Sequence, residues 1–330
     1  MANRPFFYGG QAVIEGVMIR GQRFFSLAVR RQDGSVYRAA EPLSNMYAGR
    51  MRRVPFIRGV LLLLETLILG FKVLTRSANI ALEDRTEGEM EEISGWVMFL
   101  TLGISVGVGI AIFFLVPLFA ARSLDSVLDS AMRSGTGADF ASNFIEGLIR
   151  LGLLVGYISL IGMMRDIRRV FAYHGAEHMT IHAYEHGRPL EVDQVRPFST
   201  AHPRCGTAFL LTVAVVAILV FALLGRPPMY WAILSRVALM PVIAGISYEV
   251  IRFAGGHQGS LLSNIVSAPG MLLQRLTTRQ PDDSQIEVAI LAMETALAAD
   301  EGRSITEEPA ADPEPRDEAS EAGPEVTLES

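Results

Sequence analysis

The stretch GWVMFLTLGISVGVGIAIFFLVPLFAA, residues 95–121, runs for 27 positions without a charged side chain. A helix needs about 20 apolar residues to cross a hydrocarbon core about 30 Å thick. A second uncharged stretch, GTAFLLTVAVVAILVFALLG at residues 206–225, meets the same requirement. Half of the 330 residues are hydrophobic and the mean hydropathy is positive, which together favour a membrane protein over a soluble one. The sequence therefore predicts transmembrane helices over both stretches.

Two further candidate spans are interrupted by charged residues. Residues 143–164 contain Glu146 and Arg150, which stand four apart and can pair on one face of a helix. Residues 230–254 contain Arg236 near the start and two charged residues near the end. With both included, the prediction is a mainly α-helical, polytopic membrane bundle of about four transmembrane helices within residues 95–276.

The distribution of positive charge predicts the orientation of this bundle. Arginines are dense before residue 95 and in the loop at residues 165–205, whereas residues 122–140 and 226–229 carry few. Short cytoplasmic loops of membrane proteins collect Lys and Arg. We therefore expect a multi-pass protein of the inner (plasma) membrane with both termini in the cytoplasm.

Residues 1–55 are predicted to form a small cytoplasmic β unit. Residues 11–18 and 24–30 form two short apolar strands, and residues 32–35 form a hairpin turn that leads to a third strand. The glycines around the first strand suit turns or a close approach of the backbone to another element. Glu15, the only acidic residue of that strand, is either a catalytic carboxylate or a polar contact between this unit and the bundle.

The remaining segments lie outside the bundle. Residues 56–94 are expected to form a helix over 60–70, lying at the interface or packed on the bundle and continuing to about Leu82, and then an acidic linker. Residues 277–299 predict an amphipathic helix that begins near Asp282. Residues 300–330 are acidic and rich in Pro, Ala, Ser and Gly, a composition typical of a disordered tail.

Five of the six histidines fall between His174 and His202, and residues 174–178 have the sequence HGAEH. On a helix, His174, Glu177 and His178 project from one face. Two imidazoles with a nearby carboxylate suit a divalent metal, with Glu177 accepting a proton from an activated water. His202 and Cys205 add two candidate ligands. The nitrogen and sulfur donors favour Zn²⁺, although a His and carboxylate set also admits Mn²⁺ or Fe²⁺.

Other roles remain open for several of these residues. The histidines can instead bond to backbone, lipid phosphate or arginines at the membrane surface. Cys205, the only cysteine, is a metal ligand, a small buried side chain or a thiol nucleophile activated by His202. Glu249 could supply a third metal ligand by analogy with inverted H-x-x-E-H metalloproteases, or form a salt bridge with Arg252 or Arg165.

Five motifs together resemble the bacterial YqhQ family. They are GGQAVIEGVM at residues 9–18, YHGAEH at 173–178, HPRCGT at 202–207, PVIAGISYE at 241–249 and LTTRQPDD at 276–283. The resemblance covers about residues 8–297 in the same order. It implies a bacterial membrane protein of a group described as predicted metal-dependent enzymes. The family pattern often has a lysine where Met179 stands here, which argues against phosphate binding at that position.

Three function classes follow from these observations. A metal-dependent hydrolase would act on peptide, amide or lipid-linked ester bonds near the inner leaflet. A membrane scaffold or assembly factor would use the same polar residues to hold the cytoplasmic pieces to the bundle. A transporter fits the intramembrane charges but lacks a visible inverted repeat. Membrane lipids and a second copy of the chain are the expected partners, and nucleic acid is not, because topology and anionic lipid account for the basic side.

Overall fold

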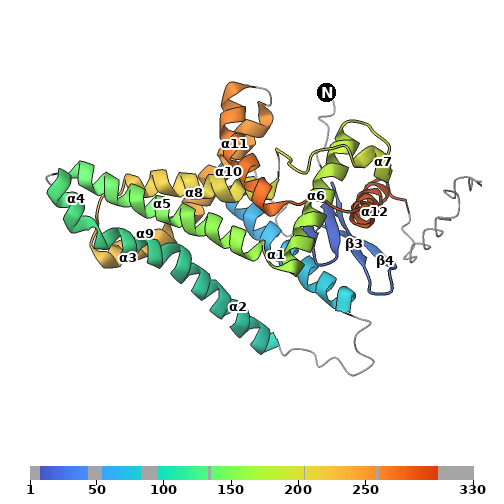
Figure 1. The fold of residues 1–330 in the computed structure, drawn as a ribbon, viewed down its shortest axis with the longest axis horizontal. Helices are drawn as coiled ribbons and strands as arrows, with labels where there is room; N and C mark the ends of the chain where they lie inside the picture. Colours follow the sequence, from blue (N-terminus) through green and yellow to red (C-terminus); the bar gives the residue numbers. More distant parts are fainter. Residues whose placement is uncertain are drawn as a thin grey trace, which may run out of the picture.

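The computed structural model describes residues 8–43, 54–82, 95–132, 135–203, 205–257 and 260–303. Figure 1 shows an elongated helical bundle joined at one end to a smaller lobe that contains a β-sheet. The chain is mainly helical, with a small sheet near its N-terminus, as the sequence predicts. The expected acidic linker before residue 95 and the acidic tail beyond residue 303 lie outside the described residues.

The sheet contains four antiparallel strands in chain order: β1 (Gly9–Val13), β2 (Gly16–Arg20), β3 (Phe24–Arg30) and β4 (Val36–Pro42). The expectation of three strands is wrong because residues 11–18 are not one strand. The chain reverses after Val13, which pairs with Gly16, and Glu15 adopts a φ of 52° in the turn. Apolar alternation continues through this tight turn, so periodicity alone does not reveal it.

Helices cover both faces of the sheet. On one face, side chains such as Val17, Ile19 and Ala28 pack against α6 (Arg165–Glu185) and α12 (Asp283–Asp300). The opposite face uses the alternate positions, among them Met18, Phe25 and Leu27, to pack against the C-terminal half of α1 (Ile57–Leu82). The period-two alternation of these strands thus builds two separate hydrophobic cores.

Helix α1 connects the bundle to the lobe. It continues to Leu82, as expected, and its C-terminal half lies on the sheet while its N-terminal end lies beside α10 (Met240–Gly256). Glu65 is buried where the two halves meet, and its Oε1 atom accepts a hydrogen bond from Arg20 at 3.1 Å. The one acidic residue of this helix therefore faces protein.

The bundle begins with α2 (Gly95–Ile110), the π-helical turn η4 (Ala111–Leu115), α3 (Val116–Ser123), α4 (Asp125–Met132) and α5 (Thr136–Ile161). By length and composition, the described residues contain two helices able to cross a membrane, Gly103–Ser123 and Thr136–Ile161. A third results if α9 (Met229–Ala238) and α10, bent by 45°, count as one span. Helix α8 (Gly206–Ala222) is apolar but shorter.

A buried polar cluster lies inside the bundle. Glu146 accepts hydrogen bonds from Arg150 at 2.6 Å and from Arg236 at 2.5 Å, so the expected pairing of Glu146 with Arg150 is confirmed. Arg150 also donates through Nε to the carbonyl of Phe113, within the π-helical turn, at 2.9 Å. Pro117, which would be the α-helical partner of this carbonyl, has no N–H to donate, so Arg150 supplies the missing hydrogen bond.

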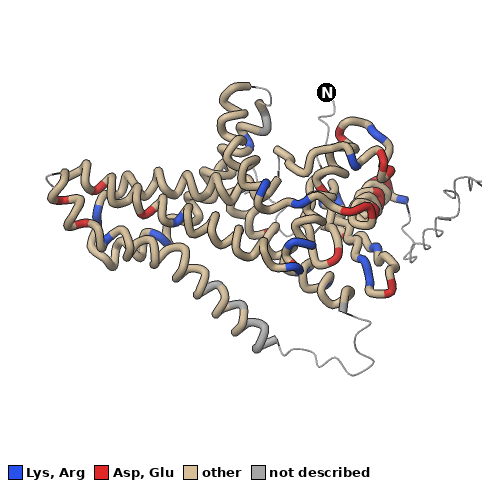
Figure 2. The backbone as a smooth tube through the Cα atoms, viewed as in Figure 1, with Lys and Arg blue, Asp and Glu red and all other residues tan. Residues whose placement is uncertain are grey.

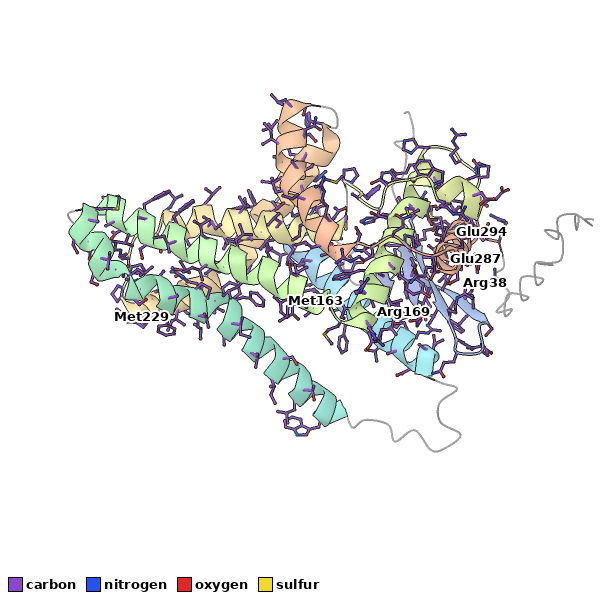
Figure 3. All side chains as sticks on the ribbon, viewed as in Figure 1. Arg38, Met163, Arg169, Met229, Glu287 and Glu294 are labelled. Atoms are coloured by element: carbon purple, nitrogen blue, oxygen red, sulfur yellow. The ribbon has the colours of Figure 1, made fainter. Side chains whose placement is uncertain are left out.

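The histidine helix α6 is separate from α5 and does not continue it. The chain bends at residues 162–164, and Met163, labelled in Figure 3, is 73% exposed at this junction. After α6 come α7 (Val192–Val195), then α8 to α10, and then α11 (Leu261–Thr277). Figure 2 shows charged residues gathered mainly in the lobe and at its junction with the bundle, whereas most of the bundle is uncharged.

Candidate metal centre

Helix α6 and the residue that precedes α8 bring three candidate ligands together. His174 and His178 lie one turn apart on α6, and the Nε2 atom of His174 is 3.2 Å from Sγ of Cys205. One ligand atom from each of these residues lies within 4.8 Å of the others. Cys205 is the N-cap of α8, and its sulfur accepts a hydrogen bond from the Thr207 amide. The helix start therefore fixes the thiol toward the two imidazoles.

Backbone carbonyls orient both histidine rings. The Nδ1 atom of His174 lies 2.8 Å from the carbonyl oxygen of Thr277, and that of His178 lies 2.6 Å from the carbonyl oxygen of Thr200. These contacts require a proton on Nδ1, which leaves the Nε2 lone pair free to bind a metal. Among the described residues, the buried Nε2 atom of His178 has no hydrogen-bond partner. The lone pair of this buried nitrogen is therefore available to a metal ion.

Glu177 lies beside the two imidazoles. Its Oε2 atom is 4.0 Å from Nε2 of His174 and 3.9 Å from Nε2 of His178. Burial raises the pKa of Glu177 to about 7, while His174 and a hydrogen bond from the Gly10 amide partly oppose the rise. A carboxyl group with a pKa near neutrality is suited to exchange protons with a substrate.

Gly10 allows β1 to approach this carboxylate. A Cβ atom at Gly10 would lie 2.8 Å from Oε1 of Glu177 and 2.6 Å from the carbonyl oxygen of Met18. Any larger residue would therefore displace either the carboxylate or the neighbouring strand. The close backbone approach expected for these glycines is confirmed at Gly10.

Burial also favours the neutral form of His178 and His182. It lowers the pKa of His178, against smaller opposing contributions that include Cys205, and it lowers the pKa of His182. Because a metal ligand must be deprotonated, neutral imidazoles are ready to bind at neutral pH.

A second group lies one turn further along α6. His182, Glu185 and His202 each offer one ligand atom within 4.8 Å of the others, and Nε2 of His202 is 3.4 Å from a Glu185 oxygen. The His178 and His202 rings are 5.7 Å apart, centroid to centroid. His202 therefore adjoins the first group without joining its ligand set, and Glu185 is a candidate that sequence reasoning missed.

The first group opens into a cavity of about 170 Å³. Its walls come from β1, β2, α1, α6 and the start of α8, and the lining includes Glu177, His178, His202, Cys205 and Arg20. Arg20 was not a sequence candidate; it ends β2, two residues after the motif at residues 9–18. The cavity thus lies between the sheet, α1, α6 and the start of α8.

The structure does not bring Glu15 or Glu249 to this group. Glu15 accepts hydrogen bonds from Nε and Nη2 of Arg169, both at 2.5 Å, and from the Tyr173 hydroxyl at 3.3 Å. This geometry matches the alternative of a polar contact that holds the β unit against α6. Glu249 pairs with Arg58 at 2.7 Å, which joins α10 to α1; the expected partners Arg252 and Arg165 do not hold it.

Gly175 provides a test of how α6 is held against the α11–α12 connection. A Cβ atom there would lie 2.2 Å from the carbonyl oxygen of Arg279, close to the segment that orients His174. We expect Gly175→Ala to destabilise the protein by about 1–3 kcal/mol, because backbone must move. Thermal unfolding in detergent measures the change.

Gly152→Ala is the matched control, since a Cβ atom at Gly152 meets nothing within 4 Å. This helical substitution should be neutral or stabilising by up to about 1 kcal/mol. Equal losses in the two variants would contradict the packing argument.

Comparison with known proteins gives two matches. Residues 54–299 match a family model described as "Protein of unknown function (DUF1385)". The chain is also 38% identical over 297 residues to "Uncharacterized protein YqhQ" of Bacillus subtilis (strain 168), covering 87% of this chain and 91% of that protein. No solved structure matches. The chain therefore belongs to the DUF1385 family and is a relative of YqhQ, as its motifs indicate.

Proposed function

We propose that this protein is a metal-dependent membrane enzyme, with hydrolysis as its reaction class, whose site lies at the cytoplasmic surface of the bacterial plasma membrane. The observation that carries the proposal is the convergence of His174, His178 and Cys205 beside buried Glu177 at a cavity. Groups of this kind are expensive to bury without a partner.

The donor set fits zinc better than manganese or iron, because it combines two imidazoles with a sulfur. His174, His178 and Cys205 would hold the ion, which when bound supplies Lewis acidity that polarises a carbonyl or phosphoryl oxygen. Glu177 would accept a proton from the attacking nucleophile and return it to the leaving group. The cavity walls would limit access of bulk water.

A scaffold is the second candidate, favoured by three ion pairs between separate elements. Arg20 pairs with Glu65, Arg169 with Glu15 and Arg58 with Glu249. These pairs hold the sheet, α6 and α10 to their neighbours. A scaffold requires no metal, however, and gives no reason for two imidazoles and a thiol to converge. Stoichiometric metal therefore separates the two candidates.

Cobalt substitution tests the ligand set directly. Co²⁺ bound to the purified protein should show a sulfur-to-metal charge-transfer band, and Cys205→Ser should remove that band because oxygen replaces sulfur. Glu177→Gln is the matched control, since it should retain the band. A band that persists in Cys205→Ser, or no Co²⁺ or Zn²⁺ binding in the wild-type protein, would contradict the proposal.

Four membrane spans with both termini in the cytoplasm are part of the same proposal. The start of α5 contacts the end of α8, where Asn143 donates to the Gly225 carbonyl at 2.7 Å. The end of α5 packs against the start of α8 through Ile158 and Leu211. Helix α8 therefore runs antiparallel to a membrane-length helix, and its 17 residues extend about 26 Å.

Two further contacts support this topology. Arg226, in the loop after α8, pairs with Asp129 of α4 at 2.8 Å and with Asp139, in the first turn of α5, at 3.1 Å. The two segments expected outside, residues 122–140 and 226–229, therefore lie together. At the other end, the sheet, α6 and α12 share one hydrophobic core. They must lie on one side of the membrane, which requires an even number of crossings between them.

Cysteine labelling in intact cells tests the topology. In a Cys205→Ser background, a membrane-impermeant maleimide should label Ser130→Cys, in α4, from outside. Ser199→Cys, exposed in the lobe, should react only after the cells are opened. The reverse pattern would contradict the proposed orientation.

A further inference from the structure

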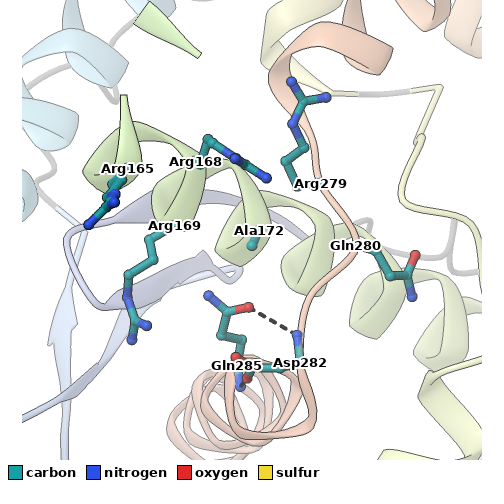
Figure 4. Close-up of a pocket in the computed structure, with 8 residues that line it drawn as sticks. All are labelled: Arg165, Arg168, Arg169, Ala172, Arg279, Gln280, Asp282 and Gln285. Carbon is teal, nitrogen blue, oxygen red and sulfur yellow. Dashed lines mark hydrogen bonds between the residues drawn. The ribbon is translucent and has the colours of Figure 1, made fainter. Parts of the chain in front are cut away.

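A groove of about 490 Å³ lies beside the first turns of α6. Figure 4 shows that four arginines surround it: Arg165, Arg168 and Arg169 come from α6, and Arg279 comes from the connection between α11 and α12. None of these arginines contributes to the metal centre. The groove therefore concentrates positive charge at a place that the proposed function does not explain.

Most of this charge has no counterion within the part of the chain that the structure describes. Glu15 neutralises Arg169 through two hydrogen bonds of 2.5 Å. In contrast, Arg165 and Arg168 are exposed and form no ion pair or side-chain hydrogen bond with any described residue. Arg279 donates a hydrogen bond to a neutral acceptor, the Arg275 carbonyl, at 3.2 Å, and this bond does not compensate the charge of the guanidinium.

The single acidic residue of the lining does not offset these arginines. Asp282 is the N-cap of α12, and its carboxylate accepts hydrogen bonds from the Gln285 amide at 2.9 Å and the Ser284 hydroxyl at 2.7 Å. The start of α6 adds the positive end of a 21-residue helix. A compact group with several acceptor oxygens, such as a phosphate, complements this arrangement.

The position of the groove identifies the source of that phosphate. It begins directly after α5, a helix long and apolar enough to cross a membrane. Leu160, in the last turn of α5, is 65% exposed, and Met163 and Met164, which separate α5 from Arg165, are 73% and 57% exposed. Exposed apolar side chains next to arginines are typical of the depth at which a membrane changes from acyl chains to headgroups.

We propose that this groove binds the headgroup phosphate of an anionic phospholipid of the inner leaflet. Arg165, Arg168 and Arg279 contact the phosphate, while the exposed Leu160 and Met163 contact the acyl chains. The lipid holds the α5–α6 junction at the membrane surface. This site is independent of metal binding, so it remains intact when the histidine ligands are replaced.

Thermal stability with short-chain lipids tests the proposal. The purified protein is heated in a neutral detergent with dioctanoyl phosphatidylglycerol, with dioctanoyl phosphatidylcholine or with inorganic phosphate. A ligand that binds only the folded state raises the melting temperature, and at equal concentration a tighter ligand raises it more. We expect phosphatidylglycerol to raise it more than the other two compounds.

Arg165→Gln/Arg168→Gln should weaken the apparent phosphatidylglycerol affinity by about tenfold or more, because each basic residue beside an anionic headgroup strengthens binding about fivefold. The control Arg188→Gln/Arg303→Gln removes the same charge from exposed sites elsewhere and should leave the affinity unchanged. The His174→Ala/His178→Ala variant should also keep it, which separates this proposal from the metal centre.

Each alternative outcome overturns the proposal. An equal shift with inorganic phosphate would assign the groove to free phosphate, and an equal shift with phosphatidylcholine would show binding through acyl chains alone. An equal loss in the control double variant would indicate net charge without a site.

Discussion

His174→Ala/His178→Ala is expected to abolish metal binding. The wild-type protein, loaded with Zn²⁺ and washed, should hold about one ion per chain. A structural zinc site contributes roughly 10–16 kcal/mol of binding free energy across its ligands, so the loss of two ligands should weaken binding by several orders of magnitude. Elemental mass spectrometry on detergent-purified protein measures the change.

His186→Ala/His257→Ala provides the control. Both histidines are exposed and belong to neither ligand group, so zinc content should equal that of the wild-type protein. Normal folding of each variant is verified by its melting temperature and its elution profile. An absence of zinc in the wild-type protein would end the metalloenzyme proposal and favour the scaffold, whereas zinc retained in the ligand variant would place any site elsewhere.

Glu146→Gln is expected to destabilise the bundle strongly. Glu146, Arg150 and Arg236 have exposed fractions of 2%, 6% and 1%, and Glu146 is the carboxylate that both arginines contact. Its removal leaves two buried guanidinium groups without a counterion, which typically costs about 3–5 kcal/mol. Thermal unfolding, followed by the fraction that remains monodisperse, measures this loss.

Two variants make this result specific. Glu287→Gln removes a carboxylate from a partly exposed pair with Arg30 and should cost about 1 kcal/mol or less. Glu146→Leu combined with Arg150→Met and Arg236→Met removes all three charges and should recover much of the lost stability. If the triple variant is no more stable than Glu146→Gln, buried unpaired charge is not the cause.

The apolar helices and the histidine helix were predictable because each has a strong local signal. The uncharged residues 95–121 indicate a helix long enough to cross a membrane, and the four-residue spacing of Glu146 and Arg150 indicates their pairing. The turn at Glu15 was not predictable. Its neighbours Ile14 and Gly16 continue the apolar pattern, and a non-glycine residue with positive φ gives no signal in sequence.

In the candidate site, too, the features with a local sequence signal were predicted and the others were not. His174, Glu177, His178 and Cys205 were proposed from spacing and chemistry, and the structure brings them together. Contacts between distant segments were missed, because sequence spacing carries no information about them. Arg20 reaches the cavity only because the sheet packs on α6. Glu249 had the right chemistry for a ligand, but Arg58, 191 positions away, occupies it.

Because β2, α6 and α12 share one core, the lobe cannot finish folding until α12 has been synthesised. The sheet leaves the ribosome before α12, which covers one of its faces and is completed only at Asp300. The nascent chain must therefore carry an exposed apolar sheet face while the helices of the bundle are made. A chain truncated before Asp283 should insert into the membrane yet remain sensitive to protease in its N-terminal lobe. The lobe thus becomes resistant to protease only after the bundle has been synthesised.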